Sequence, residues 1–135
     1  MSTLFVADAD TVFQFILGKL LTKYPVFIKV QYFKCGVPLL AHLSDHKDNA
    51  AQLPDVIFLE LYFKSVSGWD ILNNLQALYS SLCKKIEVYV VTASVADIDR
   101  DRVCAYSCVR EFVSKPLSLE KVIAIANRHQ YVERI

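Results

Sequence analysis

The stretch from Asp55 to Leu72 reads DVIFLELYFKSVSGWDIL, and it decides the fold class. After Asp55 comes a continuous apolar run, VIFL, which is typical of a strand buried on both faces of a parallel sheet. Glu60 follows this run directly, so we expect it at the C-terminal edge of the strand, where open α/β sheets build their binding crevices. From Gly68 onward, apolar residues recur at helical spacing, which predicts a helix behind the loop.

The same alternation of a short apolar strand and an amphipathic helix repeats along the chain. The expected strands are residues 3–8, 26–33, 55–59, 86–91 and 109–113, and the expected helices begin near residues 10, 36, 68, 96 and 118. Residues 44–52 are expected to be a helix end that runs into a loop. Alternating strands and helices predict a parallel sheet with right-handed crossovers. We therefore expect one domain over residues 1–135 with no output domain, a flavodoxin-like (βα)5 three-layer sandwich with strand order 2-1-3-4-5.

Composition and charge narrow the classes of function. The formal net charge is +1, which supplies no broad positive field for nucleic acid or for an anionic membrane surface. The N-terminus lacks the pattern of a signal peptide, and no apolar run approaches the roughly 20 residues that a membrane span needs. We therefore expect a soluble, cytoplasmic protein with no nucleic-acid or membrane partner.

Cysteine and histidine residues suggest two further sites, which we interpret as structural. The chain has four cysteines, Cys35, Cys83, Cys104 and Cys108. They lack C-x-x-C spacing and have apolar neighbours, which favours buried thiols over disulfides or zinc. A histidine pair at residues 42 and 46 has i, i+4 spacing, which is compatible with a metal site. We interpret this pair as a solvated helix end, with metal binding as the alternative.

Four polar side chains are predicted to meet at one edge of the sheet. Asp8 and Glu60 follow the first and third strands, which are neighbours at the switch point of this topology. Thr92 and Lys115 follow the fourth and fifth strands at the same edge. Asp10 lies close by, so this edge holds an acidic pocket facing one lysine.

The segments that carry these residues resemble a known family over the whole chain. They read LFVADAD, PDVIFLELYFKSVSGWDIL, VYVVTAS and REFVSKPLSLEKV, in this order. They are similar to the receiver domain of two-component response regulators, the CheY-like family. The resemblance implies a signalling domain in a phosphorelay pathway, not an enzyme, with a sensor kinase or a downstream signalling protein as partner. It also implies a partner or homodimer surface formed by residues 97–102 and the segment after Pro116.

The resemblance assigns roles to the residues at the sheet edge. Glu60 occupies the position where the family normally has the phosphoacceptor aspartate. The family's two metal-binding acids correspond to Asp8 and Ala9, and the backbone carbonyl of Tyr62 would be a further Mg²⁺ ligand.

The remaining switch residues follow from the same alignment of segments. Thr92 and Lys115 correspond to the residues that bind phosphoryl oxygens, and Phe112 corresponds to the aromatic residue that reports the state of the domain. Without a hydroxyl group, Phe112 is expected to serve mainly in core packing, although it could still change rotamer.

Three positions depart from the family pattern. Ala9 removes a carboxylate from a site where Mg²⁺ wants oxygen ligands, so we expect Mg²⁺ to bind weakly or not at all, and no other cofactor. The Glu60 side chain moves its carboxylate outward by about one C–C bond, roughly 1.5 Å. Phosphoryl transfer depends on positioning and charge neutralisation, so phosphorylation of Glu60 is not expected. Lys64 stands where the family usually has a proline.

Several alternatives stay open at this point. Glu60 either imitates part of a phosphoryl group and biases the domain towards an active-like arrangement, or forms a buried ion pair with Lys115. The apolar residues of the following loop, Tyr62, Phe63 and Val66, either form a docking patch or tuck under the loop. A different functional class is a flavodoxin-like protein that binds a flavin or another small molecule at the same sheet edge.

Overall fold

The structure is a computed structural model that describes residues 2–63, 66–93 and 97–134. Strands and helices alternate along the chain, with one short 3₁₀ helix before the third strand. The strands are β1 (Ser2–Ala7), β2 (Phe27–Phe33), β3 (Val56–Leu59), β4 (Glu87–Thr92) and β5 (Val109–Ser114). The helices are α1 (Thr11–Lys23), α2 (Gly36–Asp45), η1 (Ala50–Gln52), α3 (Gly68–Tyr79), α4 (Asp97–Cys104) and α5 (Leu119–Arg134).

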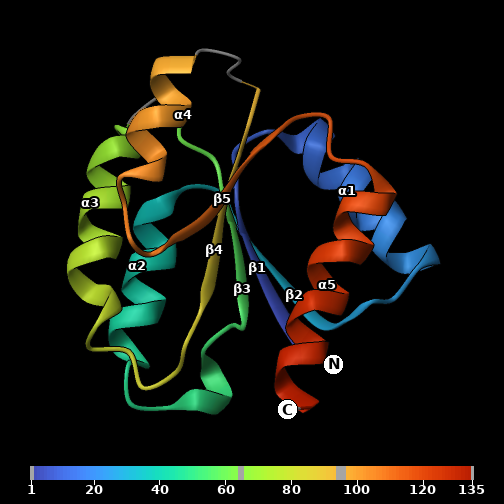
Figure 1. The fold of residues 1–135 in the computed structure, drawn as a ribbon, viewed down its shortest axis with the longest axis horizontal. Coiled ribbons are helices and arrows are strands. Elements are labelled where there is room, and N and C mark those ends of the chain that lie inside the picture. The colour runs from blue at the N-terminus through green and yellow to red at the C-terminus, as the bar shows by residue number, and fades with distance from the viewer. Residues whose placement is uncertain (1, 64–65, 94–96, 135) are drawn as a thin grey trace.

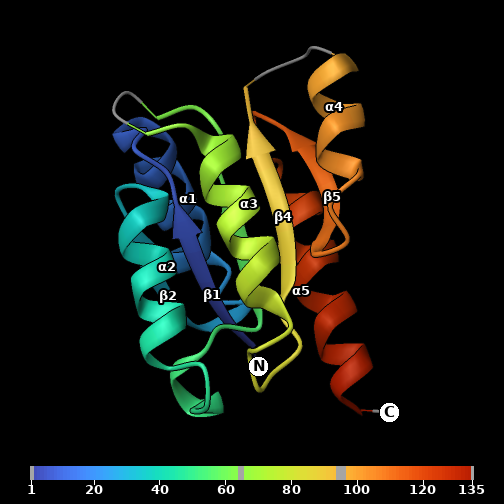
Figure 2. The same ribbon diagram turned by 90° about the vertical axis from the view of Figure 1, so that its left-hand side faces the viewer.

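The strands form one parallel sheet in the order β2-β1-β3-β4-β5, which confirms the predicted topology. Helices α2, α3 and α4 cover one face of this sheet, and α1 and α5 cover the other (Figure 1). Figure 2 shows the first of these faces, with α2, α3 and α4 towards the viewer. The result is the expected three-layer sandwich, in which all strands end at the same edge.

The central strand β3 explains why its sequence is continuously apolar. Val56 and Phe58 belong to the core cluster under α1 and α5, whereas Ile57 and Leu59 belong to the cluster under α2 and α3. All four side chains are buried. Because a strand exposes alternate residues to opposite faces, both faces of β3 need apolar side chains.

Hydrogen bonds mark the start of α5 and the end of α4. Ser118 caps the start of α5, since the Lys121 N–H donates to Ser118 Oγ at 3.1 Å. Helix α4 ends at Cys104. The Tyr106 N–H donates to Val103 O at 3.0 Å, three residues back, so the chain tightens into a turn there.

The prediction of buried cysteines is correct for Cys108 and wrong for Cys83 and Cys104, which are exposed. Cys35 is half-buried, and all four thiols are free. Cys83 lies in the turn after α3 and Cys104 is the last residue of α4, so their apolar sequence neighbours do not surround them in space.

The histidine pair is more than a solvated helix end. The His42 ring packs against Phe5 and Phe33, with centroid distances of 5.1 and 5.9 Å. Its Nε2 lies 2.8 Å from the carbonyl oxygen of Gln52, which ties α2 to η1. The His46 ring is 4.5 Å from that of His42. In the described part of the chain, no group of three His, Cys, Asp or Glu residues is arranged to hold a metal ion.

None of the helices within the described ranges combines the length and apolar character required for crossing a bilayer.

Candidate functional site

The predicted site residues do meet at the C-terminal edge of the sheet. Glu60 directly follows β3, and its N–H donates to the carbonyl of Ala7 at the end of β1, at 3.0 Å. Thr92 is the last residue of β4, and its carbonyl accepts the N–H of Lys115 at 2.8 Å. Asp8 directly follows β1. The sheet ladder thus continues into the site and fixes where these side chains begin.

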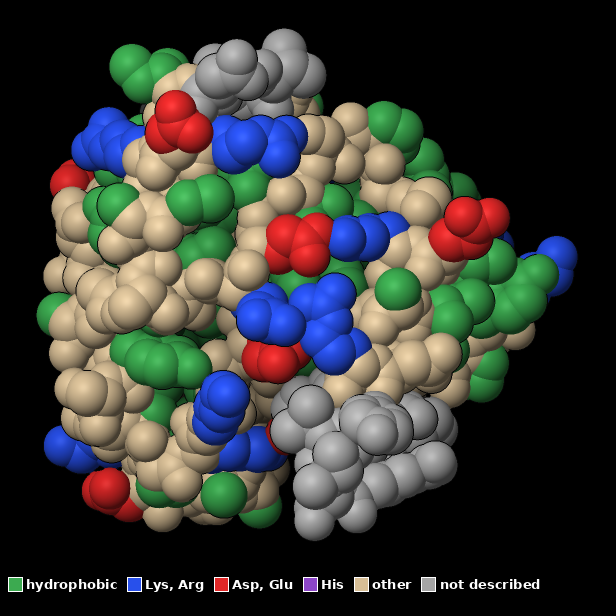
Figure 3. Space-filling model, in the orientation of Figure 1, with side chains coloured by type: hydrophobic (Ala, Val, Ile, Leu, Met, Phe, Trp, Pro, Cys, Tyr) green, Lys and Arg blue, Asp and Glu red, His purple; other side chains and the backbone are tan. Residues whose placement is uncertain are grey.

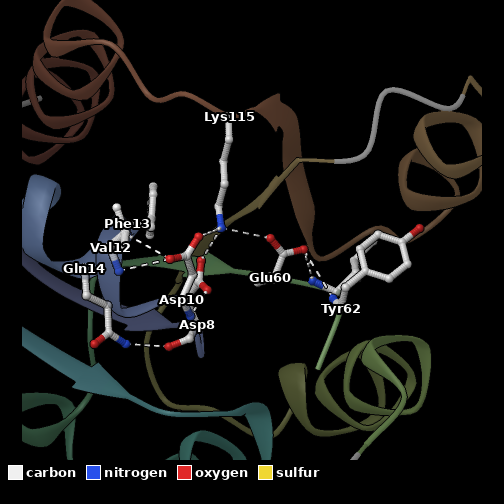
Figure 4. Close-up of polar contacts among 9 residues, drawn as sticks. Asp8, Asp10, Val12, Phe13, Gln14, Glu60, Tyr62 and Lys115 are labelled. Carbon is white, nitrogen blue, oxygen red and sulfur yellow. Dashed lines mark hydrogen bonds and ion pairs between the residues drawn. The ribbon is translucent and has the colours of Figure 1, made fainter. Parts of the chain in front are cut away.

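The ammonium group of Lys115 lies between the two acidic sides of the pocket (Figure 4). Its Nζ is 2.8 Å from Asp8 Oδ2 and 3.1 Å from Glu60 Oε2. Asp10 Oδ2 is more distant, at 3.9 Å. The side chains of Lys115, Asp8 and Glu60 are only 13%, 4% and 7% exposed. Two carboxylates therefore share the charge of one lysine in a largely buried environment.

The second oxygen of Glu60 holds the loop that follows β3. Glu60 Oε1 accepts the N–H groups of Leu61 at 2.8 Å and Tyr62 at 3.2 Å. Gly68, at the start of α3, allows this loop to approach closely, because a Cβ atom there would lie 1.8 Å from Leu61 O. Both oxygens of the Glu60 carboxylate are thus engaged within the domain.

The two aspartates after β1 have different roles. Asp8 Oδ1 accepts the N–H of Asp10 at 2.9 Å, and its carbonyl accepts a hydrogen bond from the Gln14 side chain. Asp10 is the N-cap of α1, since its Oδ1 accepts the N–H groups of Val12 at 3.0 Å and Phe13 at 3.1 Å. Asp8 therefore faces Lys115 directly, while Asp10 mainly starts the helix.

The sharing of one ammonium group by two carboxylates appears in the pKa shifts. Burial raises the pKa of Asp8, the Lys115 ammonium opposes this rise, and the nearby Glu60 carboxylate adds to it. Burial alone would lower the pKa of Lys115, but its contacts with Asp8 and Glu60 outweigh this effect, and the Lys115 pKa is raised. The lysine therefore stays charged, and the excess negative charge falls on the buried acids.

The donor set fits a divalent cation poorly. Ala9 contributes no carboxylate and is exposed. The oxygens of Asp8 and Glu60 that could approach a cation are already 2.8 and 3.1 Å from Lys115 Nζ. Mg²⁺ needs near-octahedral oxygen ligands, so it would have to displace this ammonium group.

Tyr62 and Phe112 connect the site to α4. The Tyr62 side chain is 54% exposed, and its hydroxyl donates to Asp99 of α4. Phe112 is buried in the core, and the Arg100 guanidinium lies 4.9 Å from its ring centroid. The sequence showed a charged run at residues 97–102 but gave no sign that its side chains contact the site residues.

Other predicted residues divide between core and surface. Thr92 is fully buried. Val66 packs against the core, as the tucked-loop alternative predicted, whereas Tyr62 is exposed. Lys64, which departs from the family pattern, lies outside the described residues.

Comparisons with solved structures agree with this fold. The chain superimposes on a two-component response regulator from Cytophaga hutchinsonii with a TM-score of 0.82 and 18% identity, covering 96% of each chain. A response regulator receiver protein from Dyadobacter fermentans gives a TM-score of 0.77 and 21% identity, covering 95% of this chain and 97% of the other. At these identities the likeness establishes the fold.

Sequence comparison identifies the family. The family model described as response regulator receiver domain matches residues 4–127. The chain is also 31% identical, over 93 residues, to the probable methanogenesis regulatory protein FilR2 of Methanothrix harundinacea (strain 6Ac). That match covers 68% of this chain and 57% of the relative, so the chain spans little more than half of the relative's length. This chain belongs to the response regulator receiver domain family.

Proposed function

We propose that this receiver domain signals in a phosphorelay pathway through protein contacts, without phosphorylation of residue 60. The observation that carries the proposal is the engagement of both Glu60 oxygens, one with Lys115 at 3.1 Å and the other with the N–H groups of Leu61 and Tyr62. An acceptor must be free to attack in line with a metal-bound phosphoryl group, and such reactions depend on positioning and charge neutralisation. Glu60 is not free to attack, because both of its oxygens are engaged, and Ala9 supplies no carboxylate for the metal that would neutralise the phosphoryl group.

The same contacts support a fixed arrangement of the site. The Glu60 carboxylate carries about one negative charge, against −1.5 to −2 for a phosphorylated side chain. It nevertheless holds Lys115, the residue that would otherwise bind phosphoryl oxygens, and it also holds the following loop. We infer that Glu60 maintains one state of the domain permanently. This geometry is compatible both with a purely structural ion pair and with a partial imitation of the phosphorylated state. Measurements of partner binding would distinguish these two alternatives.

Exposed apolar side chains support a role in protein contacts. On α1, Val12, Phe15 and Ile16 are 65%, 64% and 55% exposed, and their spacing places them on one side of the helix. Grouped exposed apolar residues commonly mark interaction surfaces. We propose a protein partner, such as a sensor kinase or a downstream signalling protein, that contacts this helix.

Phosphorylation is tested by incubating the protein with acetyl phosphate and Mg²⁺ and measuring its intact mass. We expect no added phosphoryl group. The matched variants are Glu60→Asp, Ala9→Asp and the double variant Ala9→Asp/Glu60→Asp, and we expect Mg²⁺-dependent labelling of the double variant. A stoichiometric adduct on the unmodified protein would refute the proposal.

A second measurement tests the fixed state. Beryllofluoride with Mg²⁺ is expected to leave the amide NMR spectrum of the unmodified protein unchanged and to shift the spectrum of the Ala9→Asp/Glu60→Asp variant. Large shifts in the unmodified protein would show that Glu60 does not fix the site. With a purified partner, retained binding by Glu60→Ala would favour the purely structural ion pair.

A further inference from the structure

A separate cavity lies at the opposite edge of the sheet from Glu60 and Lys115. It has a volume of about 370 Å³ and is formed where β4 and β5 begin, with walls from the end of α3 and from α5. Because the sheet is parallel, the starts of β4 and β5 face away from the edge where Glu60 lies. This cavity is therefore distinct from the predicted phosphoacceptor region.

The charged residues that line the cavity are mainly basic. Among the described residues that line the cavity, these are Lys85, Arg110 and Arg128, against one acid, Glu87. Three positive charges and one negative charge leave a net of +2. In Figure 3, Lys and Arg side chains gather near the middle of the face on which β5 and α5 lie, with Asp or Glu side chains beside them. Like charges that converge on one concave site raise the local potential and attract anions.

The basic groups are only partly neutralised by the protein. In the described part of the chain, neither Lys85 nor Arg110 forms an ion pair within 4.0 Å. Arg128 has a long contact of 3.7 Å with Glu111 and donates to the Tyr89 hydroxyl at 3.3 Å. Two of the three cations can therefore turn towards a ligand without breaking an ion pair.

The uncharged groups in the wall are compatible with an anion. Ser107 Oγ accepts a hydrogen bond from Gln76 Nε2 at 2.8 Å, and its own proton can be donated to a ligand. Burial raises the pKa of the Cys108 thiol to about 11, so this group is neutral at ordinary pH and adds no repulsion. Glu87 is occupied in part, because its Oε2 accepts the Tyr89 hydroxyl at 3.0 Å.

We propose that this cavity binds a small dianion that carries a phosphate monoester group. Its net charge of +2 matches the charge of such a group. Guanidinium groups recognise phosphate oxygens through paired hydrogen bonds, and an ammonium group adds a further charge-assisted contact. The volume of about 370 Å³ falls at the lower end of small-molecule pockets, which limits the ligand to a compact molecule. This inference is independent of the function proposed above.

The direct test is a titration of the protein with phenyl phosphate at constant ionic strength, followed by amide NMR. We expect saturable shifts that centre on residues 107–110, with a dissociation constant below about 1 mM. Benzyl alcohol, which has the ring without the charge, should cause no such shifts. Absence of saturation, or shifts centred on Lys115, would overturn the proposal.

Variants test whether these basic residues form the site. Lys85→Ala/Arg110→Ala is expected to weaken phenyl phosphate binding by at least about tenfold, and both side chains are exposed, so the fold should persist. The matched control is Lys29→Ala/Lys34→Ala, which removes the same charge from exposed residues at the β2 edge and should leave binding unchanged.

The acid in the wall provides a test with the opposite sign. Glu87→Gln removes the one negative charge in the cavity while keeping an acceptor for the Tyr89 hydroxyl, and it should tighten binding a few-fold. Equal weakening by both double variants would show that the ligand responds only to overall charge and would refute a specific site. No effect of Glu87→Gln would show that the ligand does not bind beside this acid, and it would refute the proposed site as well.

Discussion

Removing the shared ammonium group is the sharpest test of the site geometry. In the unmodified protein, Lys115 Nζ lies 2.8 Å from Asp8, 3.1 Å from Glu60 and 4.3 Å from the Phe13 ring centroid. Lys115→Met keeps a long side chain that can still pack near Phe13, but it removes the positive charge beside the two carboxylates. These two carboxylates are 4% and 7% exposed, so they would face each other with little water. Breaking a buried pair by removing one partner costs roughly 3–5 kcal/mol. Since domains are stable by only about 5–15 kcal/mol, the loss should be large.

The assay is urea denaturation, which reports the unfolding free energy from its midpoint and slope. The matched control is Lys121→Met, because Lys121 pairs with Glu111 where both side chains are 33% exposed, and we expect a loss of only about 0–1 kcal/mol. Adding Glu60→Gln to Lys115→Met should restore part of the stability, because it removes one of the two unpaired carboxylates. If Lys115→Met costs no more than the Lys121 control, the buried pairs do not stabilise the fold and our reasoning is refuted.

Three further outcomes are expected. Glu60→Gln should lower the pKa of Asp8, as measured by NMR titration. Because the Asp8 pKa is raised in the folded state, the contribution of Asp8 to stability is complete below its ordinary pKa of 3.8 and is lost as the pH rises through the folded pKa. The Glu60→Gln variant should therefore lose less stability over this pH range than the unmodified protein. An unchanged Asp8 pKa would contradict the conclusion that Asp8 and Glu60 share the charge of Lys115. Gly68→Ala should lower the unfolding free energy by about 1–3 kcal/mol, since its Cβ would lie 1.8 Å from a backbone oxygen of the loop after Glu60. The control is Gly18→Ala, whose Cβ would lie 3.6 Å from the Tyr32 hydroxyl oxygen. This variant should stabilise α1 by about 0.5–1 kcal/mol. Asp10→Ala should cost about 0.5–2 kcal/mol in thermal or urea unfolding because α1 loses its cap, and Asp10→Asn should cost much less.

The fold was predictable because its signals are local and agree with one another. The VIFL run of β3 is apolar throughout, and the structure buries all four of its side chains. Alternation of such strands with helices leaves few topologies once crossovers are right-handed. The end of α4 was less predictable, because no glycine or proline marks it in the sequence. The turn at Tyr106 is instead defined by a hydrogen bond from the Tyr106 N–H to the Val103 carbonyl.

The site was predictable as a meeting of residues but not as a set of contacts. Parallel strands bring Asp8, Glu60 and Lys115 to one edge whatever their rotamers, so spacing along the chain is enough. Whether Lys115 pairs with one acid or both depends on side-chain paths of several bonds, which no periodicity encodes. The contact between Tyr62 and Asp99 joins segments 37 residues apart, and the sequence contains no signal for it.

Family membership also separates the two functional classes that the sequence left open. A flavodoxin-like binder and a receiver domain share the sheet order, so the fold alone does not choose between them. The match to the receiver family over residues 4–127 favours signalling. The flavin or small-molecule alternative rested on the sheet edge, where Asp8 and Glu60 are instead occupied by Lys115.

A built-in counterion has a consequence for how such a domain could be regulated. A metal ion or a phosphoryl group can bind and leave, whereas Lys115 belongs to the chain and stays between Asp8 and Glu60. A ligand shifts a conformational equilibrium only by its difference in affinity for the two states. Under the proposed function, no phosphoryl group binds at residue 60, and a protein partner supplies that difference. Regulation would then follow the concentration of the partner and its affinity for the fixed state, and a kinase would change signalling only by acting on that partner.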